Sequence, residues 1–352
     1  MTKKTKVALL FGGASNEYEV SLRSAYAVYR HLPPECTPIL IGIAKDGDWL
    51  HYKGDPALIE KDEWQKDVAR LSRIHITLAP HGALHTNAGE DITPDLFLPI
   101  LHGQTCEDGR LQGLLDLIGI PYVGCGCAAS VCGMDKAVTK MIAESEGIPV
   151  AAWLLFTRDE LTADGLALAV QKVEERFPAY PVFVKAVNSG SSVGAFRADD
   201  RAALYTALSE AAKVDFKILV EEFVVGREVE TAVLTKGENL TVFAPGEIEP
   251  CADFYDYDTK YKNDTANYYI PARVSAQTLG TVREYAARIF RAIGARHLSR
   301  VDFFVTEDER IIFNEINTLP GFTSISMYPK LAEAGGVSFD RLVNALIEEA
   351  LS

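Results

Sequence analysis

Residues 300–317 of the chain read RVDFFVTEDERIIFNEIN, two apolar runs separated by an acidic turn. This pattern predicts a pair of antiparallel strands. Alternate residues of a strand share a face, so Arg300 projects with Asp302, and Glu315 projects with Asn317. Folding the strands about the turn places Asp302 opposite Glu315, so that two carboxylates and an amide oxygen converge. Such all-oxygen ligation suits Mg2+ that also binds phosphate groups. An ion pair between Arg300 and Glu315 on a solvated face is the alternative interpretation.

A loop of small residues, Asn188-Ser-Gly-Ser-Ser-Val-Gly194, follows a predicted strand over 181–187. Its two glycines flank two hydroxyl side chains, so backbone N–H groups can approach an anion closely. Lys185 lies on the apolar strand just before the loop, where a lysine needs an anionic partner to remain charged at low cost. The stretch is therefore interpreted as a phosphate cradle. Taken alone, a loop rich in serine and glycine is also typical of an ordinary turn.

The N-terminal third of the chain alternates strands with helices. Predicted strands cover 7–11, 38–43 and 96–101, an order that is typical of a parallel sheet in an α/β fold. The Gly12-Gly13 turn does not match the dinucleotide fingerprint, whose glycines occupy the first, third and sixth positions, and no P-loop sequence occurs. The following loop either presents backbone N–H groups beside the Glu17 carboxylate or is simply a solvated acidic loop.

Length and pattern predict the division of the chain into domains. Its 352 residues allow two or three compact units at roughly 150 residues each. We expect an N-terminal α/β unit over 1–125, a central unit over 126–216 that opens with a helix over 128–146, and a C-terminal unit over 217–352. The C-terminal unit has a predicted strand over 240–248 and a polar loop at about 249–270, which is long enough to be a lid or a binding loop.

Composition excludes several classes of protein. The 35 basic and 49 acidic side chains give a formal charge of −14, which argues against a broad surface for nucleic acid but leaves room for a basic pocket that binds a small polyanion. The short apolar stretch near the start is far below a signal peptide or a spanning segment, so we expect a cytoplasmic protein that binds no membrane. The six cysteines lack a second paired cluster with zinc-like spacing and are interpreted as reduced thiols.

Together these motifs resemble the D-alanine:D-alanine ligases of the ATP-grasp superfamily, and the resemblance spans essentially the whole chain. The motifs that carry it are, in order, Gly12-Gly13 with Glu17-Tyr-Glu-Val-Ser21, Leu101-His-Gly103, Glu107-Asp-Gly109, Leu111-Gln-Gly113, Met134-Asp-Lys136, Lys185 with Gly190-Ser-Ser-Val-Gly194, Phe254-Tyr-Asp-Tyr257, Lys260-Tyr261, Arg300-Val-Asp302, Asn314-Glu-Ile-Asn317 and Pro320-Gly-Phe-Thr323. Each motif is weak by itself, whereas their occurrence together in this order is highly specific.

The resemblance implies an N-terminal parallel α/β domain followed by two ATP-grasp subdomains, the central and C-terminal units, which clamp ATP between them. The residues implied to bind ATP are Lys136, Lys185, Ser192, Glu221, Glu222, Phe223, Val224, Glu228, Tyr255 and Lys260. The lysines at 136 and 185 are implied to face the phosphates, residues 221–224 the adenine edge and Glu228 the ribose. Family members often carry lysine at the position of Glu222, and backbone groups there can still form hydrogen bonds with adenine.

The resemblance also implies a metal site and an amino-acid site. Asp302, Glu315 and Asn317 are implied to hold two Mg2+ ions, with Mn2+ as an alternative. The residues implied to bind the amino acids are Glu17, His102, Tyr261, Arg300, Gly321, Ser326 and Met327, and those implied to be catalytic are Glu17, Ser191, Arg300, Gly321 and Ser326. Glu17 is implied to bind the ammonium group of the first D-alanine and to form a hydrogen-bonded trio with Ser191 and Tyr261.

The implied reaction is the ATP-dependent ligation of two D-alanines through an acyl phosphate, for peptidoglycan precursor synthesis, by a homodimer. Glycopeptide-resistance relatives that make D-Ala-D-Ser or D-Ala-D-Lac are the alternative, because the N-terminal half looks close to the D-serine type. The Lys260-Tyr261 pair and the apolar Met327 favour D-alanine as the second substrate. A non-catalytic nucleotide-binding protein of the same fold is a further hypothesis, but it predicts lost metal ligands, and all three are present.

Overall fold

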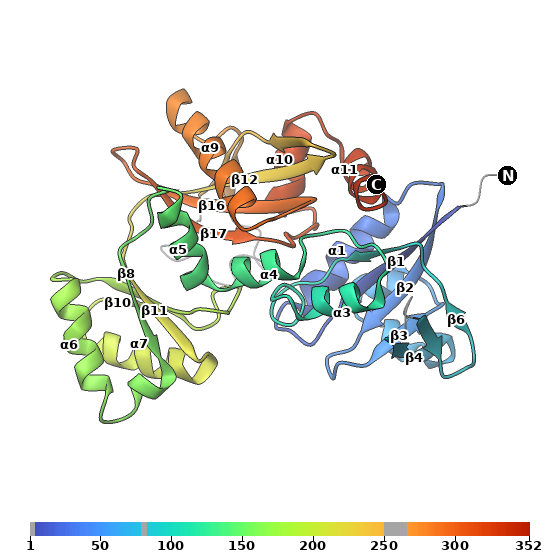
Figure 1. The fold of residues 1–352 in the computed structure, drawn as a ribbon, viewed down its shortest axis with the longest axis horizontal. Coiled ribbons are helices and arrows are strands. Elements are labelled where there is room, and N and C mark those ends of the chain that lie inside the picture. The colour runs from blue at the N-terminus through green and yellow to red at the C-terminus, as the bar shows by residue number, and fades with distance from the viewer. Residues whose placement is uncertain (1–3, 79–82, 250–265) are drawn as a thin grey trace.

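Three β-sheets follow one another along the chain and are spread out side by side, as the computed structural model shows (Figure 1). The structure describes residues 4–78, 83–249 and 266–352. Within these ranges no helix is both long enough and apolar enough to cross a membrane.

The first sheet has the strand order β6-β5-β4-β3-β2-β1-β7. Its strands are β1 (Thr5–Gly12), β2 (Cys36–Ile43), β3 (Trp49–Tyr52), β4 (Leu71–Thr77), β5 (Ala83–Thr86), β6 (Asp91–Ile92) and β7 (Leu96–Pro99). The expected parallel pairing is confirmed for β1, which pairs with β2 and with β7. Strands β3 to β6 extend this parallel part in antiparallel fashion. Its helices are α1 (Tyr18–Arg30), α2 (Ala57–Glu60) and α3 (Arg110–Ile118).

The second sheet, with the order β10-β9-β11-β8, is antiparallel throughout. It consists of β8 (Trp153–Thr157), β9 (Val182–Ala186), β10 (Ala195–Ala198) and β11 (Lys217–Glu222), and it carries the helices α6 (Leu166–Arg176) and α7 (Arg201–Val214). Its apolar cluster is built only from this part of the chain, between Ala152 and Val220. The second sheet with its two helices therefore has a core of its own.

The third sheet has the order β15-β14-β12-β16-β17, with β13 beside β12. The strands are β12 (Arg227–Lys236), β13 (Asn239–Val242), β14 (Gly246–Glu249), β15 (Asn267–Tyr269), β16 (Leu298–Val305) and β17 (Ile311–Asn317). The prediction of one strand over 240–248 is wrong, because Pro245 lacks the N–H group that would continue the ladder and β13 and β14 end on either side of it. The loop predicted at 249–270 begins and ends in paired strand residues, since Glu249 of β14 lies opposite Asn267 of β15.

The helices that pack on the third sheet come from both sides of it in the sequence. They are α4 (Cys127–Met134), α5 (Lys136–Ser145), α9 (Ala276–Ala292), α10 (Met327–Ala334) and α11 (Phe339–Ala350). The prediction of a single helix over 128–146 is wrong, because Asp135 ends α4 and caps α5 by accepting the N–H groups of Ala137 and Val138. Helices α4 and α5 share a core with β16, β17 and α9, although the predicted boundary at residue 126 assigns them to the central unit.

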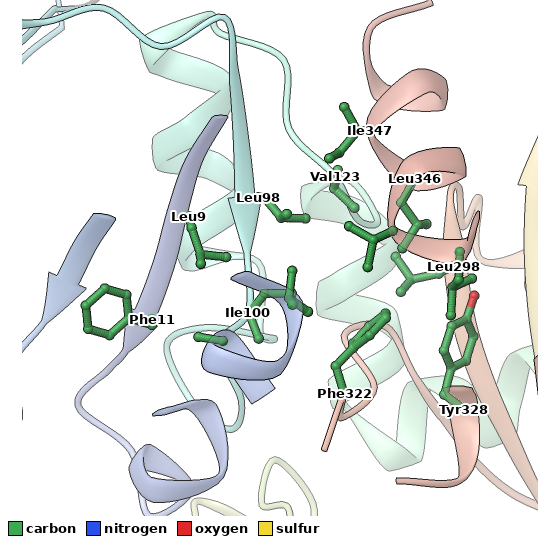
Figure 2. Packing of buried hydrophobic residues seen from close by; sticks show 14 of the residues in the cluster. Leu9, Phe11, Leu98, Ile100, Val123, Leu298, Phe322, Tyr328, Leu346 and Ile347 are labelled. Atoms are coloured by element: carbon green, nitrogen blue, oxygen red, sulfur yellow. The ribbon is translucent and has the colours of Figure 1, made fainter. Parts of the chain in front are cut away.

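One large apolar cluster joins the first and third sheets. Leu98 and Val123 from the N-terminal part lie beside Leu346 and Ile347 of α11 (Figure 2). Burying such side chains contributes roughly 1.5–3 kcal/mol each, so these two parts of the chain form one packed body. The second sheet, which keeps a separate core, faces the third sheet across a cleft.

Candidate active-site cleft

A cavity of about 740 Å³ lies between the second and third sheets, which is large enough for a nucleotide. The predicted ATP-binding residues that line it are Lys136, Lys185, Ser192, Glu221, Glu222, Phe223, Val224 and Glu228. The predicted metal ligands Asp302 and Glu315 line it as well. Tyr255, Lys260 and Tyr261 lie outside the described residues.

Two lysines from different elements point into this cavity. Lys136 is the first residue of α5, and its Nζ donates to the Ser189 carbonyl at 2.8 Å and lies 3.3 Å from Glu315 Oε2. Lys185 is on β9, and its Nζ donates to Asn314 Oδ1 at 3.1 Å. Both ammonium groups therefore bridge the second-sheet side and the β17 edge of the cleft, where they can neutralise an anion between the two sheets.

The segment 221–223 forms the wall at the end of β11. The Glu221 carboxylate is buried, with one oxygen 2.6 Å from Lys185 Nζ and the other paired with Lys140. Burial by itself would raise the pKa of Glu221, but the charges of Lys185 and Lys140 outweigh it and lower this pKa to about 2. Glu222 Oε1 accepts the Ala152 N–H at 3.0 Å, while the Arg197 guanidinium lies 4.8 Å from the Phe223 ring centre.

Lys140 was missed by the sequence analysis. It stands four residues after Lys136 on α5, so helical periodicity places it on the same side of the helix. That spacing was the available signal, whereas its pairing with Glu221 joins residues that are far apart in the chain.

The loop over 188–194 reaches both the cleft and the N-terminal part. Ser191 and Ser192 have φ angles of 51° and 61°, in the left-handed region that side chains seldom adopt. Ser191 Oγ donates to Glu17 Oε1 at 2.5 Å, and the Gln104 amide donates to the Asn188 carbonyl at 2.9 Å. These hydrogen bonds attach the loop to the segments that follow β1 and β7 in the N-terminal part, so the expected contact between Ser191 and Glu17 is present.

The antiparallel pairing predicted for β16 and β17 is confirmed, with Asp302 opposite Glu315 and Arg300 opposite Asn317. A bulge follows Asp302, because the next pair is Phe303 with Phe313. Asn314 is therefore the extra residue in the ladder, and its side chain reaches Lys185 in the cleft.

Asp302 of β16 and Glu315 of β17 form the acidic edge of the cleft, and Arg300 is the cation beside them. Its Nε and Nη2 donate to the two Asp302 oxygens at 2.8 and 2.7 Å, and its Nε also lies 2.9 Å from Glu230 Oε2. Glu230 was not singled out from the sequence. Asn317 Oδ1 accepts the Leu319 N–H at 3.1 Å and is not among the residues that line the cavity.

A buried polar group lies where the first sheet meets the turn after β17. His102 Nδ1 donates to the Leu319 carbonyl at 3.0 Å, and burial lowers the pKa of His102 to about 4, so the ring is neutral at pH 7. Glu107 accepts the Gly103 N–H at 2.7 Å. Burial and then the Glu17 charge raise the pKa of Glu107 well above its ordinary value. Of the two carboxyl groups, Glu17 is the one that bonds to the 188–194 loop, through Ser191.

The residues Gly321, Ser326 and Met327 lie in the turn that leads into α10. Ser326 Oγ accepts the Thr323 N–H at 3.0 Å, and a Cβ atom at Gly321 would lie only 2.7 Å from this hydroxyl. Met327 begins α10 and is buried, with its Cε 2.8 Å from where a Cβ atom at Gly246 would stand. These three residues are not among those that line the 740 Å³ cavity.

Comparison with known proteins gives matches over the whole length of the chain. Family models described as D-ala D-ala ligase N-terminus and D-ala D-ala ligase C-terminus match residues 6–125 and 142–348. Among curated relatives, the D-alanine–D-alanine ligase of Ruminiclostridium cellulolyticum is 46% identical, with 99% of this chain and 96% of the relative covered. That of Acetivibrio thermocellus is 44% identical, with 100% and 97% covered.

Solved structures agree with these matches. The VanG D-Ala:D-Ser ligase from Enterococcus faecalis superposes with a TM-score of 0.89 at 36% identity, covering 99% of each chain. The D-alanine-D-alanine ligase from Coxiella burnetii superposes with a TM-score of 0.84 at 32% identity, covering 99% of this chain and 95% of that one.

Proposed function

The chain belongs to the D-alanine–D-alanine ligase family, and from this premise we propose that its cleft joins two D-alanines at the expense of ATP. The protein is a ligase of the ATP-grasp fold. The observation that carries the proposal is the meeting of two lysines and two carboxylates in one nucleotide-sized cavity, beside a serine loop that is bonded to Glu17. The reaction would supply dipeptide for peptidoglycan precursors.

Charge governs the first step. A carboxylate is a poor acylating agent, so the carboxylate of the first D-alanine attacks the γ-phosphorus of ATP, and ADP leaves. Lys136 and Lys185 hold the phosphate groups of ATP between the two sheets. Their positive charges offset the negative charge of these phosphates, which would otherwise repel the attacking carboxylate. The amine of the second D-alanine then displaces phosphate from the activated carbonyl and loses a proton as the amide forms.

A metal ion fits the acidic edge of the cleft. Within the described ranges no cluster of three His, Cys, Asp or Glu side chains could hold a metal, so the predicted set depends on the Asn317 amide beside Asp302 and Glu315. All three offer oxygen, the donor that Mg2+ prefers, and Mn2+ suits the same donors. When bound, the ions would neutralise charge on the phosphate oxygens. Arg300 pairs with Asp302, and Lys136 pairs with Glu315.

The amino-acid site extends from the cleft toward the first sheet. Glu17 would bind the ammonium group of the first D-alanine, and its bond to Ser191 would fix the serine loop over the reacting groups. His102 is held neutral beside the turn that contains Gly321, where the Gly321 N–H and Arg300 would stabilise the developing oxyanion. Ser326 would bind the carboxylate of the second D-alanine. Tyr261, Tyr255 and Lys260 keep the roles that the resemblance implies.

The alternative is a ligase that takes D-serine second, favoured by the likeness to the VanG D-Ala:D-Ser ligase. Met327 favours D-alanine as the second substrate, because its apolar side chain cannot form a hydrogen bond with the hydroxyl of D-serine. The preference is modest, since an apolar pocket rejects an added hydroxyl only weakly. The test is phosphate release with D-alanine alone and with D-alanine plus D-serine or D-lactate, followed by mass spectrometry of the products. D-Ala-D-Ala should predominate, and a clear preference for a mixed product would overturn the assignment.

The assembly and the location of the enzyme are proposed from the family resemblance. We expect a homodimer in the cytoplasm, where ATP is available. Light scattering of the purified protein should give twice the mass of the 38.5 kDa chain, and the mass of a single chain would contradict the dimer.

A further inference from the structure

Lys140 is a buried lysine of α5 that pairs with Glu221, a side chain of the cleft wall. Its side chain is 1% exposed, and its Nζ is paired with one oxygen of Glu221. The second oxygen of Glu221 lies 2.6 Å from Lys185 Nζ. The three residues come from α5, β11 and β9, and all of them line the cavity between the second and third sheets.

This triad carries an uneven charge. One carboxylate lies between two lysine side chains, so the fully ionised triad has a net charge of +1. Burial lowers the pKa of Lys140, and the Glu221 charge opposes this shift. The pKa of Glu221 is lowered to about 2 by Lys185 and Lys140 in spite of burial, which keeps the carboxylate ionised at pH 7. Lys185 is further fixed by the hydrogen bond to Asn314 Oδ1, so its ammonium group is held between the two sheets.

Stability gives no sufficient reason for a lysine at position 140. A buried ion pair is weak evidence of stabilisation, since an apolar side chain of similar volume often packs as well or better. The consequence of the charge is clearer. If Lys140 were neutral, Lys185 would be the only cation paired with Glu221. The negative charge of Glu221 would then offset the positive charge of Lys185 more fully, and Lys185 would attract phosphate groups less strongly.

We propose that Lys140 is a positioning residue for nucleotide binding, which neutralises Glu221 from the buried side and thereby leaves the Lys185 charge available to the phosphate groups of ATP. The inference rests on the proposed function, in which Lys185 holds those phosphates. Lys140 acts through Glu221 and Lys185, and it is given no contact with the reacting atoms.

The test compares nucleotide binding in Lys140→Met with that in the wild-type protein, using isothermal titration calorimetry with ATP and, separately, with adenosine. The Kd for ATP should rise about tenfold, since one unit charge near the phosphates is lost in a medium of intermediate dielectric. The Kd for adenosine should rise less than the Kd for ATP, because adenosine has no phosphate, although Glu221 also belongs to the segment implied to face the adenine edge. KM for ATP should rise with it, whereas KM for D-alanine should not.

Lys213→Met is the matched control for charge. Lys213 is exposed and pairs with Glu210 on the same helix at 2.6 Å, outside the residues that line the cavity. This variant removes the same charge and should bind ATP like the wild type. Lys140→Arg keeps the charge and should retain more of the ATP affinity than Lys140→Met. If Lys140→Met does not fold, Lys140→Gln keeps a hydrogen-bond donor for Glu221, removes only the charge, and carries the same prediction.

Two results would overturn this role of Lys140. The first is a Kd for ATP within twofold of the wild type in a folded, neutral variant. The second is an equal weakening of ATP and adenosine binding, which would show that the lysine only shapes the pocket. A wild-type protein that bound no ATP would instead overturn the proposed function, so the two failures are distinguishable.

Discussion

The hydrogen bond from Ser191 to Glu17 should be essential for use of the first D-alanine. It joins residues 174 positions apart at 2.5 Å and is the direct bond between the phosphate-side loop and the proposed ammonium-binding carboxylate. A hydrogen bond to a charged group contributes about 1.5–3 kcal/mol. If this contribution is made fully in the transition state, Ser191→Ala should lower kcat/KM for D-alanine by roughly 10- to 150-fold.

The assay measures ADP release while D-alanine is varied at saturating ATP. Binding of ATP, measured separately, should change less than kcat/KM for D-alanine, because the Ser191 hydroxyl donates to Glu17, although Ser191 also lines the cavity. Ser191→Gly is the matched control, since it also removes the hydroxyl but relieves the positive φ of 51°. Both variants should lose activity to a similar extent. A kcat/KM within twofold of the wild type for Ser191→Ala would refute the reasoning, and activity retained only by Ser191→Gly would assign the effect to backbone conformation.

Three further predictions concern the acidic edge, a turn and the pH dependence of stability. Glu315→Ala should abolish measurable turnover while circular dichroism and the melting temperature stay close to the wild type, and retained turnover would contradict the metal assignment. Gly12→Ala should lower the free energy of unfolding by about 3 kcal/mol or more in urea titration, since its Cβ would lie 2.2 Å from the Ile43 carbonyl oxygen at a φ of 89°. His297 accepts the Gly124 N–H, and burial, then Arg296, lower its pKa from 6.5 to about 4. Because the unfolded chain binds a proton that the folded chain does not, the free energy of unfolding should fall by up to about 3 kcal/mol between pH 6.5 and 4, and His297→Asn should flatten that slope.

Local pattern was sufficient to predict the pairing at the acidic edge. Alternation along two apolar strands gave the opposition of Asp302 and Glu315, and a lysine on an apolar strand before a glycine-rich loop pointed to the anion site. These features depend on residues close in sequence, where the strand period determines the direction of the side chains.

Features that depend on distant partners could not be predicted in this way. The bulge after Asp302, which brings Asn314 into the cleft, has no signature in composition. Lys140 and Glu221 are 81 positions apart, and no local pattern relates them. The antiparallel strands β3 to β6 are at most seven residues long and owe their formation to pairing with neighbours that are already in place.

The most direct test of the central claim follows one oxygen atom. D-Alanine labelled with 18O in its carboxylate is incubated with the enzyme, ATP and Mg2+, and the phosphate and dipeptide are analysed by mass spectrometry. If the carboxylate attacks the γ-phosphorus, one 18O atom from each activated D-alanine must appear in the released phosphate, alongside D-Ala-D-Ala and ADP. Release of unlabelled phosphate, or no dipeptide formation with D-alanine as the sole amino acid, would contradict the account.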